Sequence, residues 1–578
     1  MSPIRRLLHY FARFRTPLLL GGLCVLGSAA FSLVKPLIVG SSVDQLSTAF
    51  TRETLVRYAL LFVGASAIQG AFLFLQRRII IGTSRHMEYA MRGDLYEHMQ
   101  TLPLNYYQKQ RVGDLMSRAT NDLSSVRMLI GPAVMHAFSS ILIVVGAFIM
   151  MFRTDRMLAL VSLIAVPVVG ILSKTFGARI HDRFKLVQDH FGDLSARVQE
   201  NLAGVRVVRA FTQEENEMET FKRMNREYVE RNKGLIRMTA VFYPLLHTII
   251  GVMFVIVFFL GSRRIMTGQL TLGEFVAFQF YLARMIWPLI ALGWVINLFQ
   301  RGLASMRRLS DVWNVSPERG ESEPCRVDSF EGAIEIRNLT FAYDERPVLR
   351  DISLKIEPGQ TVGIVGRTGS GKSTLLSLIA RLYDAPEGTI FIDGCPLEAI
   401  PVGRLRDVIG TVPQETFLFS ESIAENIRFG RAEASDDELR QVAELAGLSG
   451  DVVLFPQGLE TIVGERGITL SGGQKQRTAI ARALVRDPQI LMLDDALSAV
   501  DTATEERILS SLRQVREGKT VLIVSHRVSS VKDADFVIVL EEGKIIEKGT
   551  HEELLAFEGY YSELYRRQAL EEEIEEIA

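Results

Sequence analysis

Six long apolar stretches in the first 300 residues limit most strongly what this chain can fold into. A helix of about 20 mostly apolar residues crosses the roughly 30 Å of hydrocarbon in a bilayer. Buried core helices of a soluble protein are the alternative, but six of them within 300 residues argue against it. The sequence therefore predicts six membrane-spanning helices, of which the fourth is short and extends past Ser173. They cover residues 17–40, 57–76, 129–152, 157–173, 241–261 and 274–299.

The connections between these stretches predict their orientation. Long connections at 77–128 and 174–240 alternate with short ones, so both long ones share a side of the membrane with both ends of the domain. Residues 1–15, MSPIRRLLHYFARFR, hold four arginines and no acid, which favours the cytoplasm. A cleaved signal peptide is the alternative, but no clear small-residue cleavage site follows. We expect a retained first span in the inner (plasma) membrane, preceded by an interfacial amphipathic helix.

The long connections mix apolar and charged residues at helical spacing, which predicts helices that continue beyond the bilayer. Twenty further residues of helix reach about 30 Å. Charge also divides the chain. Residues 1–320 hold 37 Lys and Arg against 21 Asp and Glu, and the remainder holds 28 against 46. Two such unlike halves indicate two environments.

In the second half, over residues 332–560, short β-rich runs alternate with helical patterns. This alternation is typical of a parallel α/β sheet. Gly366-Arg-Thr-Gly-Ser-Gly-Lys372-Ser373 fits the P-loop pattern between a predicted strand and helix. Its glycines let backbone N–H groups close on phosphate oxygens, Lys372 adds a positive charge, and the Ser373 hydroxyl can bind Mg²⁺. The residues expected to bind ATP here are Gly366, Thr368, Gly369, Ser370, Gly371, Lys372, Ser373 and Thr374.

A buried strand ending in two acids, Ile490–Asp495, follows about 120 residues later. Asp494 is expected to hold Mg²⁺, as the acid after this strand does in P-loop enzymes. A simple strand-end turn is the alternative interpretation.

Further motifs resemble those of ATP-binding-cassette (ABC) proteins. Leu470-Ser471-Gly472-Gly473-Gln474 resembles the family signature, and it lies just ahead of the acidic strand. The resemblance covers the whole chain and extends to the adenine-stacking Tyr343, the Q-loop Gln414, the X-loop Glu465, the D-loop Ser498–Asp501 and the switch His526. It implies ATP and Mg²⁺ as cofactors, and it implies that Ser373, Gln414 and Asp494 bind the metal. It also implies catalytic roles for Asp495, His526 and Gln414.

The resemblance is to the exporter type of this family. It implies an all-α six-helix transmembrane domain (1–310), a linker (311–330), a cytoplasmic α/β P-loop ATPase domain (331–565) and an acidic tail (566–578). Coupling helices are expected near 101–112 and 206–216. Two such half-transporters would pair, each ATP lying between the P-loop of one and the signature (Ser471, Gly472, Gly473, Gln474) of the other.

One residue departs from the family pattern. In this family a glutamate that acts as the general base directly follows the Walker-B aspartate, which corresponds to Asp494 here. This chain has Asp495 at the position of that glutamate. The side chain is one methylene shorter, and a misplacement of about 1 Å can cost on the order of 100-fold in rate. Either a homodimer hydrolyses ATP slowly, or this chain contributes a degenerate site to a heterodimer and its intact signature completes the partner's site. The second alternative implies a resemblance to heterodimeric multidrug exporters of the TmrAB type, in which this chain would correspond to the TmrB-like half.

The expected cargo is a hydrophobic drug, lipid or peptide, with membrane lipids as further partners and no nucleic acid. An ATP-binding subunit that gates a channel or a partner is a second possible function. Polar residues within the spans are costly and often functional; the candidates are Lys35, Gln69, His136, His247, Gln279 and Arg284. His136 and His247 are expected to hydrogen-bond between helices, and Lys35 to reach toward the membrane surface. The three cysteines (Cys24, Cys325, Cys395) predict free thiols in a reducing compartment.

Overall fold

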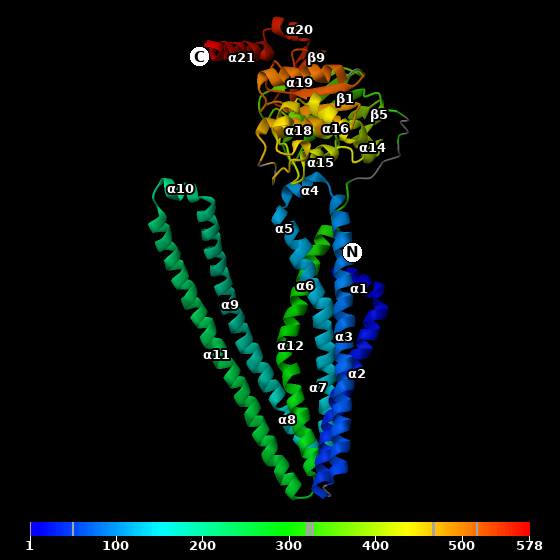
Figure 1. The fold of residues 1–578 in the computed structure, drawn as a ribbon, viewed down its shortest axis with the longest axis vertical. Helices are drawn as coiled ribbons and strands as arrows, with labels where there is room; N and C mark the ends of the chain where they lie inside the picture. The colour runs from blue at the N-terminus through cyan, green and yellow to red at the C-terminus, as the bar shows by residue number, and fades with distance from the viewer. Residues whose placement is uncertain are drawn as a thin grey trace. The chain divides into compact units, whose positions relative to one another are not determined.

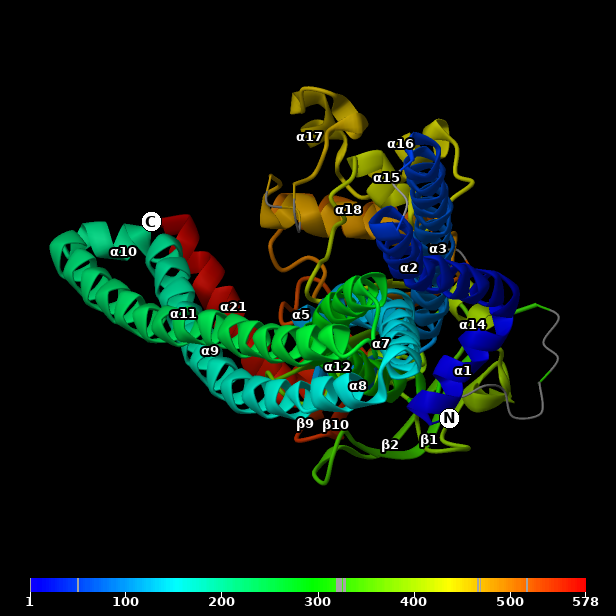
Figure 2. The same cartoon turned by 90° about the horizontal axis from the view of Figure 1, so that it is seen from below.

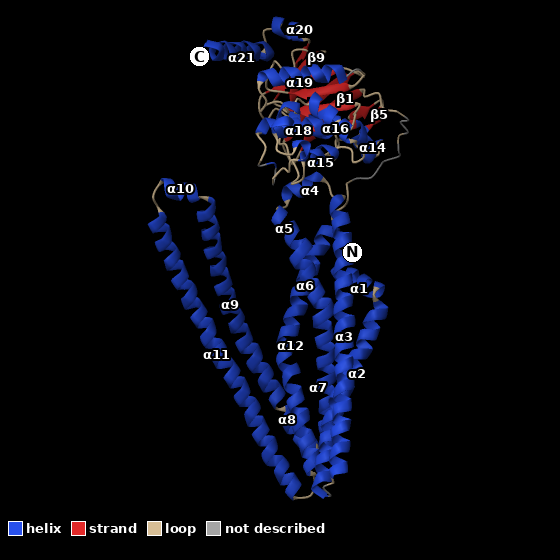
Figure 3. Ribbon diagram, viewed as in Figure 1, coloured by secondary structure: helices blue, strands red, loops and turns tan. Residues whose placement is uncertain are grey.

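The structure is a computed structural model that describes residues 2–48, 51–318, 325, 329–464, 467, 469–515 and 518–577. The chain divides into two units. The first contains residues 1–100 and 110–315, and the second contains residues 101–109 and 316–578. Figure 3 shows that strands occur in the second unit, whereas the described part of the first is helical. The predicted order of a helical domain followed by an α/β domain is therefore confirmed.

Long helices build the first unit because its apolar stretches run on into the amphipathic connections. Helix α11 has 53 residues, which at 1.5 Å per residue is about 80 Å and far exceeds the bilayer core. The helices are α1 (Pro3–Arg13), α2 (Arg15–Thr48), α3 (Arg52–Gln100), α5 (Val112–Ser117), α6 (Leu123–Met128), α7 (Val134–Thr154), α8 (Arg156–Leu163), α9 (Ala165–Ala203), α10 (Val205–Ala210), α11 (Glu214–Met266) and α12 (Leu272–Trp313). Two short π-helical turns, Arg118–Asp122 and Leu129–Ala133, join α5, α6 and α7.

Five segments of the described residues are long and apolar enough to cross a membrane. They are Arg15–Ser47, Arg52–Gln100, Val112–Thr154, Glu214–Met266 and Leu272–Trp313. Each contains one of the predicted spans. The predicted fourth span, 157–173, falls across the break between α8 and α9 at Ile164, and it stays a prediction.

Two groups of helices make up the first unit. Helices α9 and α11 pack against each other as a hairpin closed by α10, and this hairpin diverges from α2, α3, α7 and α12 toward its α10 end (Figures 1 and 2). At the other end of the unit, the Asp44 carboxylate on α2 accepts hydrogen bonds from the Thr271 hydroxyl (2.7 Å) and the Gly273 amide (2.6 Å) at the start of α12. Nearer the cytoplasmic ends, buried Asp122 accepts from Ser305 (2.9 Å) and from the Arg308 guanidinium.

The second unit contains two sheets. The six-stranded sheet has the order β10-β9-β3-β8-β7-β6, in which β10 alone is antiparallel to its neighbour. Its strands are β3 (Thr361–Gly366), β6 (Ile409–Val412), β7 (Ile490–Asp494), β8 (Thr520–Val524), β9 (Phe536–Glu541) and β10 (Lys544–Gly549). The central strands are buried along nearly their whole length, as expected when helices cover both faces of a parallel sheet.

The second sheet is antiparallel, which the sequence rhythm did not predict. Its order is β2-β1-β4-β5, with strands β1 (Ile334–Ala342), β2 (Pro347–Ile356), β4 (Ile390–Ile392) and β5 (Cys395–Pro396). Alternate residues of β1 and β2 are buried, so these strands resemble one-sided strands rather than fully buried ones.

The helices of the second unit are α4 (Leu104–Lys109), α13 (Lys372–Ile379), α14 (Val402–Val408), α15 (Ile423–Arg428), α16 (Asp436–Leu445), α17 (Ser449–Leu454), α18 (Gly472–Leu484), α19 (Thr502–Val515), α20 (His551–Ala556) and α21 (Tyr560–Ile577). Helix α4 belongs to the first long connection in sequence, yet it groups with the ATPase unit.

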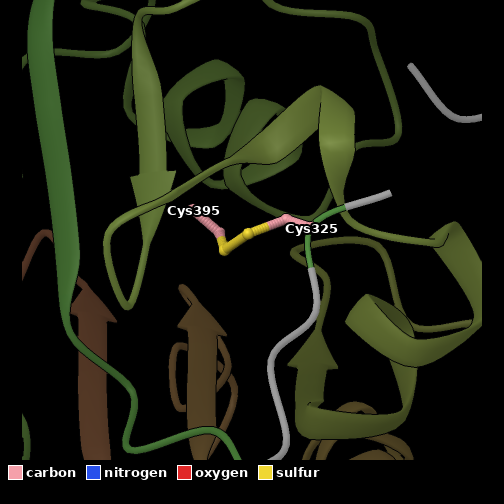
Figure 4. Close-up of a disulfide and its surroundings, with 2 residues drawn as sticks. All are labelled: Cys325 and Cys395. Atoms are coloured by element: carbon pink, nitrogen blue, oxygen red, sulfur yellow. A yellow bond between two sulfur atoms is a disulfide. The ribbon is translucent and has the colours of Figure 1, made fainter. Parts of the chain in front are cut away.

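The cysteine prediction is partly wrong. Cys325 and Cys395 form a disulfide with their Cα atoms 6.2 Å apart (Figure 4), whereas Cys24 is free. The sequence could not reveal the pair because 70 residues separate its members. They meet at the edge of the antiparallel sheet, where β5 carries Cys395 and the Cys325 amide donates to the nearby Ala399 carbonyl (2.9 Å).

Candidate functional site

Four candidate residues lie at one edge of the six-stranded sheet. Gly366 ends β3 and Asp494 ends β7, while Gln414 and His526 each follow a strand, β6 and β8, by two residues. Because these four strands are parallel, their carboxyl ends meet at the same edge. Ligands of open α/β sheets bind at this edge.

A cavity of about 290 Å³ opens there, and it brings most of the predicted ATP-binding residues together. Among the described residues, its lining consists of Val348, Gly366, Thr368, Gly369, Gly371, Lys372, Ser373, Thr374, Gln414, Asp494, Asp495, Val524 and His526. Tyr343, Asp501 and the signature residues are outside this lining. A larger cavity of about 1030 Å³ lies between α2 and α3. Since its walls are mostly aliphatic, we assign nucleotide to the smaller one.

The P-loop backbone explains its glycines. Gly369 and Gly371 have φ of +82° and +102°, a region that L-residues with a Cβ avoid. A Cβ on Gly366 would lie 2.1 Å from the Leu540 carbonyl oxygen. The Ser370 hydroxyl is buried without a hydrogen-bond partner among the described residues, so it is available to a phosphate oxygen.

Lys372 lies where β3 passes into α13. Its Nζ donates to the carbonyls of Gly366 (2.8 Å) and Arg367 (2.9 Å). Burial lowers the pKa of Lys372, while the charges of Asp494 and Asp495 act in the opposite direction. A cation kept in place by loop carbonyls next to two carboxylates suits phosphate binding.

Asp494 and Ser373 are joined by a side-chain hydrogen bond in the cavity lining. Burial raises the pKa of Asp494, with the charge of Asp495 acting in the same direction, while the hydrogen bond from Ser373 opposes it. The described residues contain no cluster of three or more His, Cys, Asp or Glu side chains that could hold a metal alone. The hydroxyl, amide and carboxylate of Ser373, Gln414 and Asp494 fit Mg²⁺, which usually combines one or two carboxylates with substrate phosphates.

Asp495 is hydrogen-bonded to His526, the predicted switch histidine. Its Oδ1 lies 2.7 Å from His526 Nδ1, and its amide donates to the Val524 carbonyl (2.9 Å). Asp495 has a φ of +51°, a left-handed conformation in which Asp and Asn are enriched. The carboxylate is thus fixed against His526 by a short side chain.

Tyr343 lies on a chain of aromatic contacts outside the cavity lining. Its hydroxyl donates to the Thr374 hydroxyl (3.1 Å), and its ring meets that of Tyr383 edge-on at 5.0 Å. Tyr383 in turn hydrogen-bonds with Gln108 of α4. Burial is the main cause that raises the pKa of Tyr383. The predicted adenine-stacking residue is therefore supported from behind by a residue that touches α4.

The signature forms the N-terminus of α18. Ser471 caps the helix and forms a capping box with Gln474, in which each side chain accepts from the other's backbone N–H. A Cβ on Gly473 would lie 2.8 Å from the Ala499 carbonyl oxygen, so this glycine permits close packing on the D-loop. Exposed N–H groups at a helix N-terminus attract anions, yet these residues do not line the described cavity of their own chain.

Gln476 contacts several of the predicted site residues, although none of the motifs in the sequence includes it. It is 6% exposed, and its amide donates to the Ser498 hydroxyl (2.9 Å) and accepts from the Ala499 amide (2.9 Å). A longer contact of 3.4 Å reaches the Asp495 carbonyl. It therefore ties the signature helix to the D-loop and to the end of β7. Its position two residues after the signature was the available signal.

The remaining predicted residues are placed as follows. Asp501 accepts from the Thr504 amide (2.9 Å) and so caps α19. Glu465 lies outside the described residues. In the membrane unit, His136 packs edge-on against Trp294 at 5.3 Å. The recorded hydrogen bond of His247 runs to Tyr243 within its own helix (2.8 Å), not to another helix.

The other membrane candidates are less constrained. Lys35 places its Nζ 5.9 Å from the centre of the Phe62 ring. The Gln279 side-chain oxygen is buried without a partner among the described residues. Gln69 and Arg284 are partly buried. None of these contacts identifies a cargo.

Comparison with known proteins agrees with this geometry. The ABC transporter transmembrane region family matches residues 18–289, and the ABC transporter family matches residues 349–498. The second match contains the P-loop, Gln414, the signature, Asp494 and Asp495.

Individual relatives match over nearly the whole chain. The probable multidrug resistance ABC transporter ATP-binding/permease protein YheI of Bacillus subtilis is 38% identical over 98% of each chain. The multidrug resistance-like ATP-binding protein MdlA of Escherichia coli is 37% identical over 94% of this chain and 92% of that protein. A solved structure of a bacterial Atm1-family ABC exporter with ATP bound has a TM-score of 0.80 at 28% identity, covering 96% of this chain and 99% of that one.

Proposed function

Because this chain belongs to the ABC transporter family, as an exporter half-transporter with a membrane domain fused to a cytoplasmic ATPase domain, we propose that it exports hydrophobic or amphipathic compounds as one half of a heterodimer. Exporters of this family work as dimers and bind nucleotide in the ATPase domain. The proposal adds the partner, the slow ATP site and the class of cargo.

The observation that carries the proposal is the short side chain of Asp495 and its contact with His526. The carboxylate is one methylene shorter than that of glutamate and is hydrogen-bonded to His526. It therefore falls short of a water beside the γ-phosphate by about 1.5 Å, the length of one C–C bond. Lys372, Ser370 and the loop amides would still bind the phosphates, and bound Mg²⁺ would offset their negative charge. The site thus retains ATP binding and loses most of its rate.

The signature supports a second, faster site formed with a different chain. Ser471 and its capping box are intact, and the exposed N-terminus of α18 can meet a phosphate held elsewhere. A partner that carries glutamate after its Walker-B aspartate would use this signature to complete its own site. One active and one slow site would then share the same dimer interface.

Helices α4 and α10 support coupling of these sites to the membrane helices. Lys109 of α4 lies 3.4 Å from Asp344, so α4 contacts the loop that carries Tyr343. In α10 and the turn after it, Val207 and Phe211 are 61% and 72% exposed. Apolar side chains this exposed at a helix tip favour burial against another chain, and we assign them to the partner's ATPase domain. Closure of the ATPase dimer on ATP would pull both helices and re-aim the membrane cavity.

The cargo class rests on the relatives and on apolar surface. YheI and MdlA are named as multidrug resistance or multidrug resistance-like proteins. The groove between α2 and α3 is lined mainly by aliphatic side chains, which suits apolar compounds or lipid. Drugs, lipids and peptides remain within the proposed class.

The test is transport by the purified complex. The chain is produced alone and together with a half-transporter encoded beside it, and each preparation is placed in liposomes with the ATPase domains outside. We expect ATP-dependent accumulation of a hydrophobic fluorescent dye with the pair and slow ATP turnover with the chain alone. Mass spectrometry that finds one subunit type in a fully active complex would refute the heterodimer. ATP-dependent conductance without accumulation of any dye or lipid would favour a regulatory subunit instead.

A further inference from the structure

The segment that joins the two units is attached covalently to the ATPase unit. Cys325 lies between the end of α12 at Trp313 and the start of β1 at Ile334, and Cys395 lies in β5 at the edge of the antiparallel sheet (Figure 4). Their Cα separation of 6.2 Å is within the usual range for a disulfide.

Backbone contacts hold this pair in place independently of the sulfur bond. The Cys325 amide donates to the Ala399 carbonyl (2.9 Å). The Arg381 side chain, 3% exposed, donates to the carbonyls of Ile400 (2.8 Å) and Leu397 (3.4 Å) on either side of Ala399. Since these contacts do not involve sulfur, they keep the thiols close when the disulfide is reduced.

The two sulfur environments differ in the way that thiol–disulfide exchange requires. Cys395 is 8% exposed, whereas Cys325 is only partly buried. Cys325 is therefore the accessible attacking residue, and Cys395 is the resolving residue.

We propose that Cys325 and Cys395 form a thiol–disulfide exchange site that responds to the low-molecular-weight thiol pool of the cytoplasm. The ATPase domain is cytoplasmic, where disulfides are rare and, when present, are usually transient or regulatory. Nothing in the nucleotide cycle uses either cysteine, and both lie away from the described cavity lining.

The exchange is balanced with a small disulfide such as oxidised glutathione as the oxidant. The Cys325 thiolate attacks one glutathione sulfur, the glutathione S–S bond breaks, and one glutathione thiolate leaves and takes up a proton. The Cys395 thiolate then attacks Cys325 sulfur and releases the second glutathione. Two protein thiols are oxidised and one glutathione disulfide is reduced to two thiols; excess reduced glutathione reverses both steps.

Oxidation would restrict the linker, a consequence that rests on the proposed function. Glu318 is already held by the Arg406 guanidinium (2.7 Å) and by a bond from its amide to the Thr101 carbonyl (2.7 Å). Asp393 accepts from the amides of residues 331–333. The disulfide adds a covalent attachment between these two anchors. A bond at this point ties the start of the second unit to the edge of its antiparallel sheet, and we expect the oxidised complex to turn over ATP more slowly.

The first experiment counts thiols in the full-length complex. The protein is equilibrated with glutathione buffers from fully oxidised to a large excess of reduced, unfolded in acid, alkylated and weighed by mass spectrometry. We expect one adduct on this chain, at Cys24, in oxidised buffer and three in reduced buffer, with the change inside the range. Three adducts in every buffer, or one adduct in every buffer, would overturn the proposal. This readout does not depend on ATPase activity, so it stands apart from the proposed function.

The second experiment measures ATP turnover in the two extreme buffers. We expect at least a twofold lower rate in the oxidised complex, and equal rates in both buffers for Cys325→Ser and Cys395→Ser. Cys24→Ser is the matched control and should respond as the unmodified chain does. If Cys395→Ser fails to fold because its site is buried, Cys325→Ser alone decides. Equal rates for the unmodified chain, with the thiol change observed, would overturn the regulatory effect.

Discussion

Replacement of Asp495 by glutamate tests the central claim about the ATP site. The longer side chain returns the carboxylate to the reach of a water beside the γ-phosphate. A displacement of about 1 Å costs roughly 100-fold in rate, which corresponds to about 2.7 kcal/mol at 1.36 kcal/mol per tenfold. The gain is opposed by the backbone, because residue 495 has a φ of +51°. Glutamate is less suited to this region than aspartate, at a cost of roughly 1 kcal/mol. The remaining difference of about 1.7 kcal/mol corresponds to an expected increase of roughly 20-fold at this site.

The assay must separate the two sites of the dimer. Phosphate release is measured in complexes whose partner has lost its own catalytic glutamate, so that turnover comes from the site of this chain. Asp495→Glu should raise this residual rate roughly 20-fold, and in the complex with an unmodified partner it should change the total by no more than about twofold. Asp487→Glu is the matched control, because Asp487 has a φ of +53° and faces Lys519 far from the cavity lining. It should leave the rate unchanged.

Two results would refute this reasoning. If Asp495→Glu leaves the partner-blocked complex as slow as before while ATP still binds, the length of the side chain is not what limits the site. If the unmodified chain alone already hydrolyses ATP at the full rate of the complex, then Asp495 acts as an adequate base and the heterodimer has no role in turnover.

Further predictions concern single contacts. Lys372→Ala should abolish labelling of this chain by a photoreactive ATP analogue while leaving the partner labelled. Gln476→Leu should remove the amide bonds to Ser498 and Ala499 and destabilise the protein by about 1–3 kcal/mol, seen as a lower melting temperature, with exposed Arg440→Ala as the unchanged control. Asp122→Asn should weaken the bonds from α12 by about 1–2 kcal/mol, whereas the exposed Asp114→Asn should leave the melting temperature unchanged. Reductant should lower the melting temperature of the unmodified chain but not of Cys325→Ser, because closing the loop from 325 to 395 contributes about 4 kcal/mol in the chain-entropy estimate; equal shifts in both would contradict this.

Much of the architecture could be predicted because it follows from local sequence patterns. Apolar runs of membrane length and a strand–glycine-loop–helix pattern need no knowledge of distant contacts. The family motifs implied that four residues lie close together: Gly366, Gln414, Asp494 and His526. The structure adds the reason, because all four lie at or just after the carboxyl ends of parallel strands.

What the sequence did not reveal depends on contacts between distant residues. The antiparallel sheet pairs β1 with β4, more than 50 residues apart, and no local periodicity encodes that choice. The Cys325–Cys395 bond and the tie between Asp122 and Arg308 have the same origin. The fourth span is ambiguous for a different reason, since its apolar residues cross a break between two helices at Ile164.

If the proposed heterodimer exists, the position of Gln476 offers a physical reason for keeping a slow ATP site. Within one chain, its side chain joins the signature helix to the D-loop and to the carbonyl of Asp495. In the proposed heterodimer, the signature would serve the partner's site and Asp495 the chain's own. A shift of β7 on ATP binding at the slow site would then move the signature that the fast site needs. The slow site would act by remaining filled, and we expect loss of the Gln476 bonds to slow the partner's turnover without weakening ATP binding to this chain. If Gln476→Leu instead weakened ATP binding to this chain and left the partner's rate unchanged, the two sites would not be joined through this residue.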